Sequence, residues 1–307
     1  MSSNRLKQII IHLLLAVFLA NAANKFFVSD LEYEEQHHFY ARIFKYHGDA
    51  PDQYRILPLL GLKVLCGSMR FNWAVLVYNC ILSFVLFELF ARLMKGQNER
   101  RIFSFNFLFA AFYIYTQYTG WRPDTMGLMV ICAFTAMIPL LKPAGVTRDV
   151  LLSVCIVALA FSRAEIALIF GIFFAFFATR SLLFRLLWLV LPLVIQVSLQ
   201  KLIFPDAVYY SKPVMLSDNF SLFYILRNPS TWLILAAIAG TWSSISSFVS
   251  STFRTYLYFY VLIAAYLVFV LVVGRVNEYR LYLPFLPLLL LIIQDVSRKP
   301  KVKSARS

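Results

Sequence analysis

The residues in this chain that could do chemistry are arginines and carboxylates that fall in short breaks between long apolar runs. A guanidinium group binds a phosphate through two parallel hydrogen bonds. A carboxylate in a partly desolvated place beside a membrane has a raised pKa and can then act as a general base. Four breaks combine the two residue types. Together they predict a site for an anionic, polyhydroxylated substrate that is reached from the membrane.

The longest break, residues 28–70, begins with the candidate general base, Asp30. On a helix that starts there, Asp30, Glu34 and His38 share one face because they are four residues apart, so Glu34 is a second catalytic candidate. A solvated acidic loop is the alternative interpretation. Glu34 and the two adjacent histidines could also bind a divalent metal. Adjacent histidines do not face the same way on a helix, however, so neither a metal site nor another cofactor is predicted.

The same break ends with Arg55, which either binds a phosphate of the substrate or only reaches the lipid headgroups. Pro58 follows it near the start of an apolar segment. This position of proline predicts a short amphipathic helix that lies at the membrane interface and runs to about Cys66.

The second and third breaks are tight turns. Arg122 and Asp124 lie in a Gly-Trp-Arg-Pro-Asp turn, where they bind substrate or only neutralise each other. Arg163 and Glu165 interrupt about thirty apolar residues, where each charge costs roughly 2.5–3.5 kcal/mol at the bilayer centre. A turn between two short helices at the membrane surface removes that cost, and it presents both charges as candidate substrate ligands. A self-neutralising pair is the alternative.

The fourth break, residues 274–280, joins the last two apolar runs. It crowds three charges and an amide into one short turn. Glu278 and Arg280 are its candidate substrate-binding residues, because apolar helix is predicted on both sides of them.

Long membrane helices are needed to position these breaks. The chain is 61% hydrophobic and 14% charged, with a mean hydropathy of +0.72, whereas soluble domains have about 25% charged residues. A helical crossing needs about 20 apolar residues. The sequence therefore predicts an all-α, polytopic transmembrane helical bundle of about nine to ten helices in a single domain, residues 1–307, with a short helix pair in 150–179. The predicted spans are 8–27, 71–91, 103–118, 125–141, 150–162, 164–179, 182–203, 231–249, 255–273 and 281–294.

The basic residues orient this bundle. If residues 150–179 form a helix pair, most of the 29 Lys and Arg residues lie in the shorter loops on one side. Loops rich in Lys and Arg stay in the cytoplasm, so both termini are predicted to be cytoplasmic, including the basic tail 295–307. The loop 28–70 is then extracytoplasmic, and the four breaks share its side.

Two further features are open to a second interpretation. The first apolar run ends in Ala20-Asn21-Ala22, which is typical of a cleaved secretory signal; an uncleaved first span is favoured because the run continues to Phe27. The net charge of +14 does not indicate a nucleic-acid partner, because the basic residues flank apolar runs. The four cysteines show no metal-ligand spacing and are interpreted as packing residues.

Several short motifs combine into one layout: Asp30 with Tyr33, Gly48, Tyr54-Arg55-Ile56-Leu57-Pro58, Arg163-Ala164-Glu165, Glu278-Tyr279-Arg280 and Pro284. This layout resembles the GT-C superfamily of integral membrane glycosyltransferases, which use polyprenyl-phosphate-linked sugars. The resemblance implies that Asp30 is the catalytic base. It also implies that outer arginines bind the lipid phosphate, the candidates being Arg55, Arg122, Arg163 and Arg280. The chain departs from the family pattern where Leu31 separates Asp30 from the next acid.

The resulting hypothesis is a membrane glycosyltransferase of a bacterial cytoplasmic membrane. It would transfer a sugar from a polyprenyl-phosphate donor to a glycan or lipid acceptor at the extracytoplasmic face, with membrane lipid as its other partner. One alternative is a transporter or flippase, which predicts charges near the bilayer midplane and repeat symmetry. The other is a non-catalytic membrane subunit of a polysaccharide assembly system.

Overall fold

The computed structural model describes residues 3–27, 38, 40–48, 52–93, 145–207, 221 and 268, and within them it contains helices and no strand. Residues 40–44 form a helical turn. The other elements are α1 (Ser3–Phe27), the 3-10 turn η1 (Asp52–Tyr54), α3 (Ile56–Cys66), α4 (Phe71–Leu93), α7 (Val146–Ser162), α8 (Ala164–Phe177), α9 (Leu182–Ser198) and the π turn η3 (Leu199–Ile203). The predicted all-α class is confirmed for this part of the chain.

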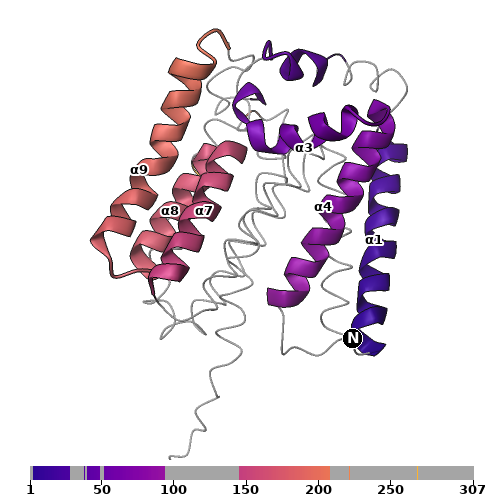
Figure 1. Ribbon diagram of the computed structural model, residues 1–307, viewed down its shortest axis with the longest axis horizontal. Coiled ribbons are helices and arrows are strands. Elements are labelled where there is room, and N and C mark those ends of the chain that lie inside the picture. The colour runs from indigo at the N-terminus through magenta and orange to yellow at the C-terminus, as the bar shows by residue number, and fades with distance from the viewer. Residues whose placement is uncertain are drawn as a thin grey trace, which may run out of the picture.

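Helices α1 and α4 form one antiparallel pair (Figure 1). Arg5 at the start of α1 pairs with Glu88 near the end of α4, and His12 Nδ1 lies 2.8 Å from Glu88 Oε1. Helix α3 lies across the other end of the bundle (Figure 1), where the Tyr78 hydroxyl of α4 donates a 2.7 Å hydrogen bond to the Pro58 carbonyl. This hydrogen bond joins the first turn of α3 directly to α4.

Helices α7, α8 and α9 form a second group, in which α7 and α8 are the short helix pair (Figure 1). The Thr179 hydroxyl, just after α8, donates a 2.6 Å hydrogen bond to Asp149 Oδ2 at the start of α7, so the two helices run antiparallel. Gly171 brings α8 against α9 so closely that a Cβ there would overlap the Trp188 carbonyl oxygen.

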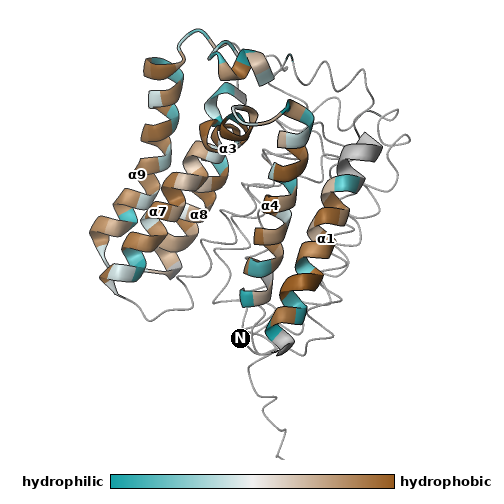
Figure 2. Ribbon diagram, turned by 45° about the vertical axis from the view of Figure 1, so that its right-hand side comes forward, coloured by the Kyte–Doolittle hydropathy of each residue, from teal (hydrophilic) through white to brown (hydrophobic). Residues whose placement is uncertain are grey.

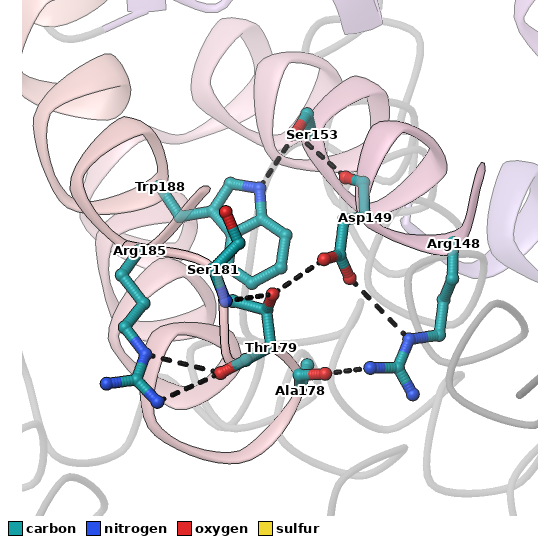
Figure 3. A network of polar contacts seen from close by, with 8 residues as sticks. All are labelled: Arg148, Asp149, Ser153, Ala178, Thr179, Ser181, Arg185 and Trp188. Carbon is teal, nitrogen blue, oxygen red and sulfur yellow. Dashed lines mark hydrogen bonds and ion pairs between the residues drawn. The ribbon is translucent and has the colours of Figure 1, made fainter. Parts of the chain in front are cut away.

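A polar network holds the open end of this helix pair, and we call Arg148, Asp149, Thr179 and Arg185 the hairpin clamp (Figure 3). Arg185 donates from Nε and Nη2 to the Thr179 carbonyl, at 3.2 and 3.1 Å, and Arg148 donates to the Ala178 carbonyl. Arg148 Nε lies 3.6 Å from Asp149 Oδ1. Guanidinium groups at the end of α8 satisfy carbonyls that have no partner in the helix and stabilise its negative dipole end.

One apolar core joins the two groups of helices. Its largest fully buried side chains come from α3, α4, α7, α8 and α9, and they are Trp188, Phe87, Phe170, Phe174, Leu62, Leu152 and Ile156. Helix α3 makes the described contact between the two groups, because it packs against both α4 and α7.

The outward faces of α1 and α9 are also apolar (Figure 2). Phe18 of α1 and Leu183 of α9 are 65% and 72% exposed. In the described part of the chain, two helical stretches, Phe71–Leu89 and Leu182–Ile203, are long and apolar enough to cross a membrane. Apolar surfaces this extensive are unusual on soluble monomers and mark contact with lipid or protein. The predicted spans 103–118, 125–141, 231–249, 255–273 and 281–294 lie outside the described residues.

A helix forms where the interfacial segment was predicted, and α3 ends at Cys66 with Pro58 in its first turn. Leu60 and Val64 are 51% and 67% exposed beside the exposed Lys63, while Leu62 is buried, so the outer face of α3 is largely apolar and carries one charge. Its place at a membrane interface stays a prediction.

Candidate functional site

The turn between α7 and α8 consists of one extended residue, Arg163, with φ −164° and ψ 104°. Its N–H donates a 2.6 Å hydrogen bond to the Leu159 carbonyl and completes α7. Its carbonyl accepts from Ile166 at 3.2 Å and from Ala167 at 3.1 Å, which starts α8. The turn between α7 and α8 lies at the end of the bundle that carries α3 (Figure 1).

Glu165 lies in the first turn of α8 and pairs with Arg163, whose Nε donates to Glu165 Oε1. The helix dipole favours a carboxylate at this position. The Arg163 side chain is 14% exposed and the Glu165 side chain is 37% exposed. The guanidinium is therefore held in place by burial and by the carboxylate, while part of the carboxylate stays accessible to a ligand.

Arg55 comes to the same place from a distant part of the chain. Two guanidinium charges attract the Glu165 carboxylate, first that of Arg163 and then that of Arg55. Both of these arginines were predicted as phosphate ligands and Glu165 as a substrate ligand. Arg163 contacts Glu165 directly, and Arg55 lies near enough for its charge to act on the same carboxylate; we call the three residues the RRE cluster: Arg55, Arg163 and Glu165.

Tyr54, the neighbour of Arg55, fixes its position. Tyr54 is buried and packs with Leu199 and Phe204 at the end of α9. Its hydroxyl donates a 3.3 Å hydrogen bond to the Ala207 carbonyl. Segments near residues 55, 163 and 204 therefore meet at one end of the bundle, and Arg55 is placed by a rigid aromatic neighbour.

A short loop before η1 supports this arrangement. The Gly48 N–H donates a 2.7 Å hydrogen bond to the Gln53 side-chain oxygen, and both residues are buried. A Cβ at position 48 would lie 2.6 Å from that oxygen and 2.6 Å from the Ile43 side chain. Glycine is thus required here by close packing, which gives a structural reason for Gly48 in the motif layout.

The RRE cluster combines two positive charges with one carboxylate, so it has an excess positive charge that attracts anions. Guanidinium groups bind phosphate oxygens in pairs, and a carboxylate accepts hydrogen bonds from hydroxyl groups. The arrangement can bind a phosphate that is attached to a polyhydroxylated group.

The other six predicted site residues lie outside the described residues, so the structure does not test them: Asp30, Glu34, Arg122, Asp124, Glu278 and Arg280. Among the residues that the structure does describe, no group of three or more His, Cys, Asp and Glu side chains is placed to hold a metal ion.

Two polar groups were not predicted from the sequence. Glu88 and His12 meet between α1 and α4, and His12 is only 2% exposed. A single carboxylate within the apolar run of α4 was the signal that could have identified this pair, since such charges need a partner. The hairpin clamp was also missed, because its arginines were assigned to loops.

In comparisons with protein-family models, with curated proteins and with solved structures, nothing matches the chain.

Proposed function

We propose that this chain is an integral membrane glycosyltransferase that uses a polyprenyl-phosphate-linked sugar. The observation that carries the proposal is the RRE cluster, in which two guanidinium groups and a carboxylate from separate segments converge at one end of an apolar helical bundle. An apolar bundle gives access to a lipid donor, and the cluster supplies ligands for the phosphate and sugar that such a donor carries.

In the proposed reaction, an acceptor hydroxyl oxygen forms a bond to the anomeric carbon of the donor sugar. The bond between that carbon and the phosphate oxygen breaks, and its electron pair leaves with the polyprenyl phosphate. Asp30 takes the hydroxyl proton as general base. Arg163 and Arg55 stabilise the negative charge on the departing phosphate, with Arg122 and Arg280 as further candidates. Glu34, Glu165, Asp124 and Glu278 orient hydroxyl groups or hold the arginines.

The arrangement of helix ends supports the proposed topology. The beginning of α1, the end of α4 and the link between α8 and α9 lie at one end of the bundle, and α3 and the turn between α7 and α8 lie at the other (Figure 1). The distribution of basic residues assigned the first of these ends to the cytoplasm and the second to the outside. We propose a polytopic protein of a bacterial cytoplasmic membrane, with both termini cytoplasmic.

The test is transfer of radiolabel by membranes that contain the protein, incubated with radiolabelled polyprenyl-phosphate sugars. Wild type is expected to transfer label to an endogenous acceptor, and Asp30→Asn is expected to lose that transfer at equal protein level. Full transfer by Asp30→Asn would remove Asp30 from the role of base. A non-catalytic subunit predicts that Asp30→Asn and Arg163→Ala both keep function while interface substitutions abolish it.

The position of the charged residues distinguishes a transporter or flippase from the proposed glycosyltransferase. It predicts movement of a lipid-linked or anionic solute across sealed vesicles without transfer of the sugar. The described cluster lies at a helix end, whereas transport sites lie near the midplane of the bilayer. Vesicle transport without label in the acceptor would favour the transporter.

A further inference from the structure

A cavity of about 280 Å³ lies where the helical turn at 40–44 covers the junction of α3 and α4. Its walls include the rings of Tyr40, Phe44 and Phe71 together with Cys66. The Tyr40 and Phe71 ring centroids are 5.4 Å apart, and those of Tyr40 and Phe44 are 6.0 Å apart, so the aromatic wall is packed rather than loose. Since a cavity of about 150 Å³ holds one benzene molecule, this cavity has room for about ten carbon atoms.

Among the residues that the structure describes, Arg70 is the one charged residue that lines the cavity, and no described acid does. The Arg70 side chain is exposed, and within the described part of the chain it has no hydrogen bond or ion pair. Helix α4 begins at the next residue, Phe71, so the positive end of a 23-residue helix adds to the guanidinium charge. An anionic group is therefore favoured at this wall, next to apolar space.

The surroundings indicate a lipid rather than a small water-soluble anion. Trp73, in the first turn of α4, is 60% exposed, and tryptophan is enriched at the level of lipid headgroups. The neighbouring helix α1 also has exposed apolar side chains on its outer face, among them Phe18 (Figure 2). A headgroup phosphate at Arg70 would then place the attached chain beside the aromatic wall.

We propose that this cavity binds the first part of one acyl chain of an anionic phospholipid, about ten carbon atoms, with the phosphate on Arg70. The ligand is a bilayer lipid that stabilises the α3–α4 junction. The site is separate from the RRE cluster, because Arg55 precedes α3 while Cys66 ends it, and 11 helical residues span about 16 Å. The proposal does not depend on the proposed transfer reaction.

Cys66 serves as the reporter for the test, in a chain whose other cysteines are replaced by alanine. The purified protein is placed in nanodiscs of phosphatidylcholine or of phosphatidylglycerol, and the rate of reaction with N-ethylmaleimide is measured. Bound lipid slows labelling by the factor 1 + [L]/Kd, so we expect at least about a threefold slower reaction in phosphatidylglycerol. Arg70→Gln is expected to remove most of this difference. Ala41→Leu, which fills the cavity, is expected to slow labelling in both lipids.

A second reporter corrects for the surface potential of the anionic lipid. Ser68→Cys, in a chain with Cys66→Ala, is exposed two residues away and does not line the cavity. If phosphatidylglycerol slows both reporters equally, or if Arg70→Gln keeps the full difference at Cys66, the proposal is wrong. It is also wrong if geranyl phosphate in phosphatidylcholine discs protects Cys66 and phosphatidylglycerol does not, because the cavity would then be an isoprenoid site.

Discussion

The Arg163 guanidinium donates a hydrogen bond from Nε to Oε1 of Glu165, two residues further along the chain. Arg163 is itself the single extended residue that separates α7 from α8. The pair holds the guanidinium at a helix end, where a second arginine, Arg55, acts on the same carboxylate. The three side chains of the RRE cluster therefore come from two segments that are distant in the sequence.

Substitutions in the RRE cluster should lower the transfer rate to different extents. Loss of a donor that stabilises developing negative charge costs about 10²–10³ in kcat, so Arg163→Gln should fall in that range. Glu165→Gln weakens a charged hydrogen bond to Arg163 and is expected to cost about tenfold or more. Initial rates of label transfer at matched protein levels measure both effects. Lys201→Gln, an exposed cation in η3, is the control and should keep the wild-type rate.

The transfer rate of Arg163→Lys distinguishes the effect of the positive charge from the effect of the paired hydrogen bonds. A lysine keeps the positive charge but not the paired hydrogen bonds, so we expect partial recovery relative to Arg163→Gln. If Arg163→Gln transfers label as fast as Lys201→Gln, the cluster has no role in the reaction.

The two ends of the bundle should differ in their access from outside the cell. In a chain without native cysteines, Lys45→Cys and Arg180→Cys place single thiols at exposed positions at the opposite ends. A membrane-impermeant maleimide is expected to label position 45 in intact bacterial cells, and position 180 only after the membrane is disrupted. Labelling of position 180 in intact cells, with position 45 protected, would reverse the orientation and place the RRE cluster in the cytoplasm.

The close approach of α8 and α9 makes Gly171 sensitive to substitution. In Gly171→Ala the new methyl group meets the Trp188 backbone, which cannot rotate away. Overpacking costs about 1–3 kcal/mol, and the gain in helix propensity returns only about 1 kcal/mol. We expect a lower thermal midpoint in detergent. Gly145→Ser is the matched control, since nothing lies within 4 Å of its new side chain and serine is favoured at a helix N-cap.

The hairpin clamp should stabilise the α7–α8 pair (Figure 3). Asp149→Ala leaves Arg148, which is 11% exposed, without its carboxylate, and loss of one partner of a buried pair costs about 3–5 kcal/mol. Thr179→Val removes only the hydroxyl that donates to Asp149 and should cost about 1–3 kcal/mol. Thr179→Ser keeps the hydroxyl and should be close to wild type. Thermal unfolding that ranks Thr179→Ser below Thr179→Val would contradict the assigned hydrogen bond.

The sequence predicted the helices and the α7–α8 turn because their cause is local. Arg163 and Glu165 cannot stay in the middle of an apolar helix without cost, so a turn was expected there. The predicted spans 8–27, 71–91 and 182–203 correspond to α1, α4 and the α9–η3 stretch, since uninterrupted apolar runs specify long helices.

Contacts between distant segments could not be predicted in the same way. The approach of the segment at Arg55 to the segment at Glu165 depends on Tyr54 packing against the residues that follow α9, which no local pattern encodes. The largely apolar outer face of α3 was also missed, because the segment was interpreted as an amphipathic helix. The pairing of His12 with Glu88 had a local signal in α4, but its partner lies on another helix.

Calorimetric binding of geranylgeranyl phosphate to the purified chain measures whether the RRE cluster binds a polyprenyl phosphate, whichever sugar the donor carries. Each lost charged hydrogen bond costs about 1.5–3 kcal/mol, so Arg55→Gln and Arg163→Gln should each raise Kd about 10- to 100-fold. Lys201→Gln should bind like wild type, and geranylgeraniol, which lacks the phosphate, should bind weakly. Equal Kd values for wild type and both arginine variants, or equal binding of the alcohol, would contradict the account.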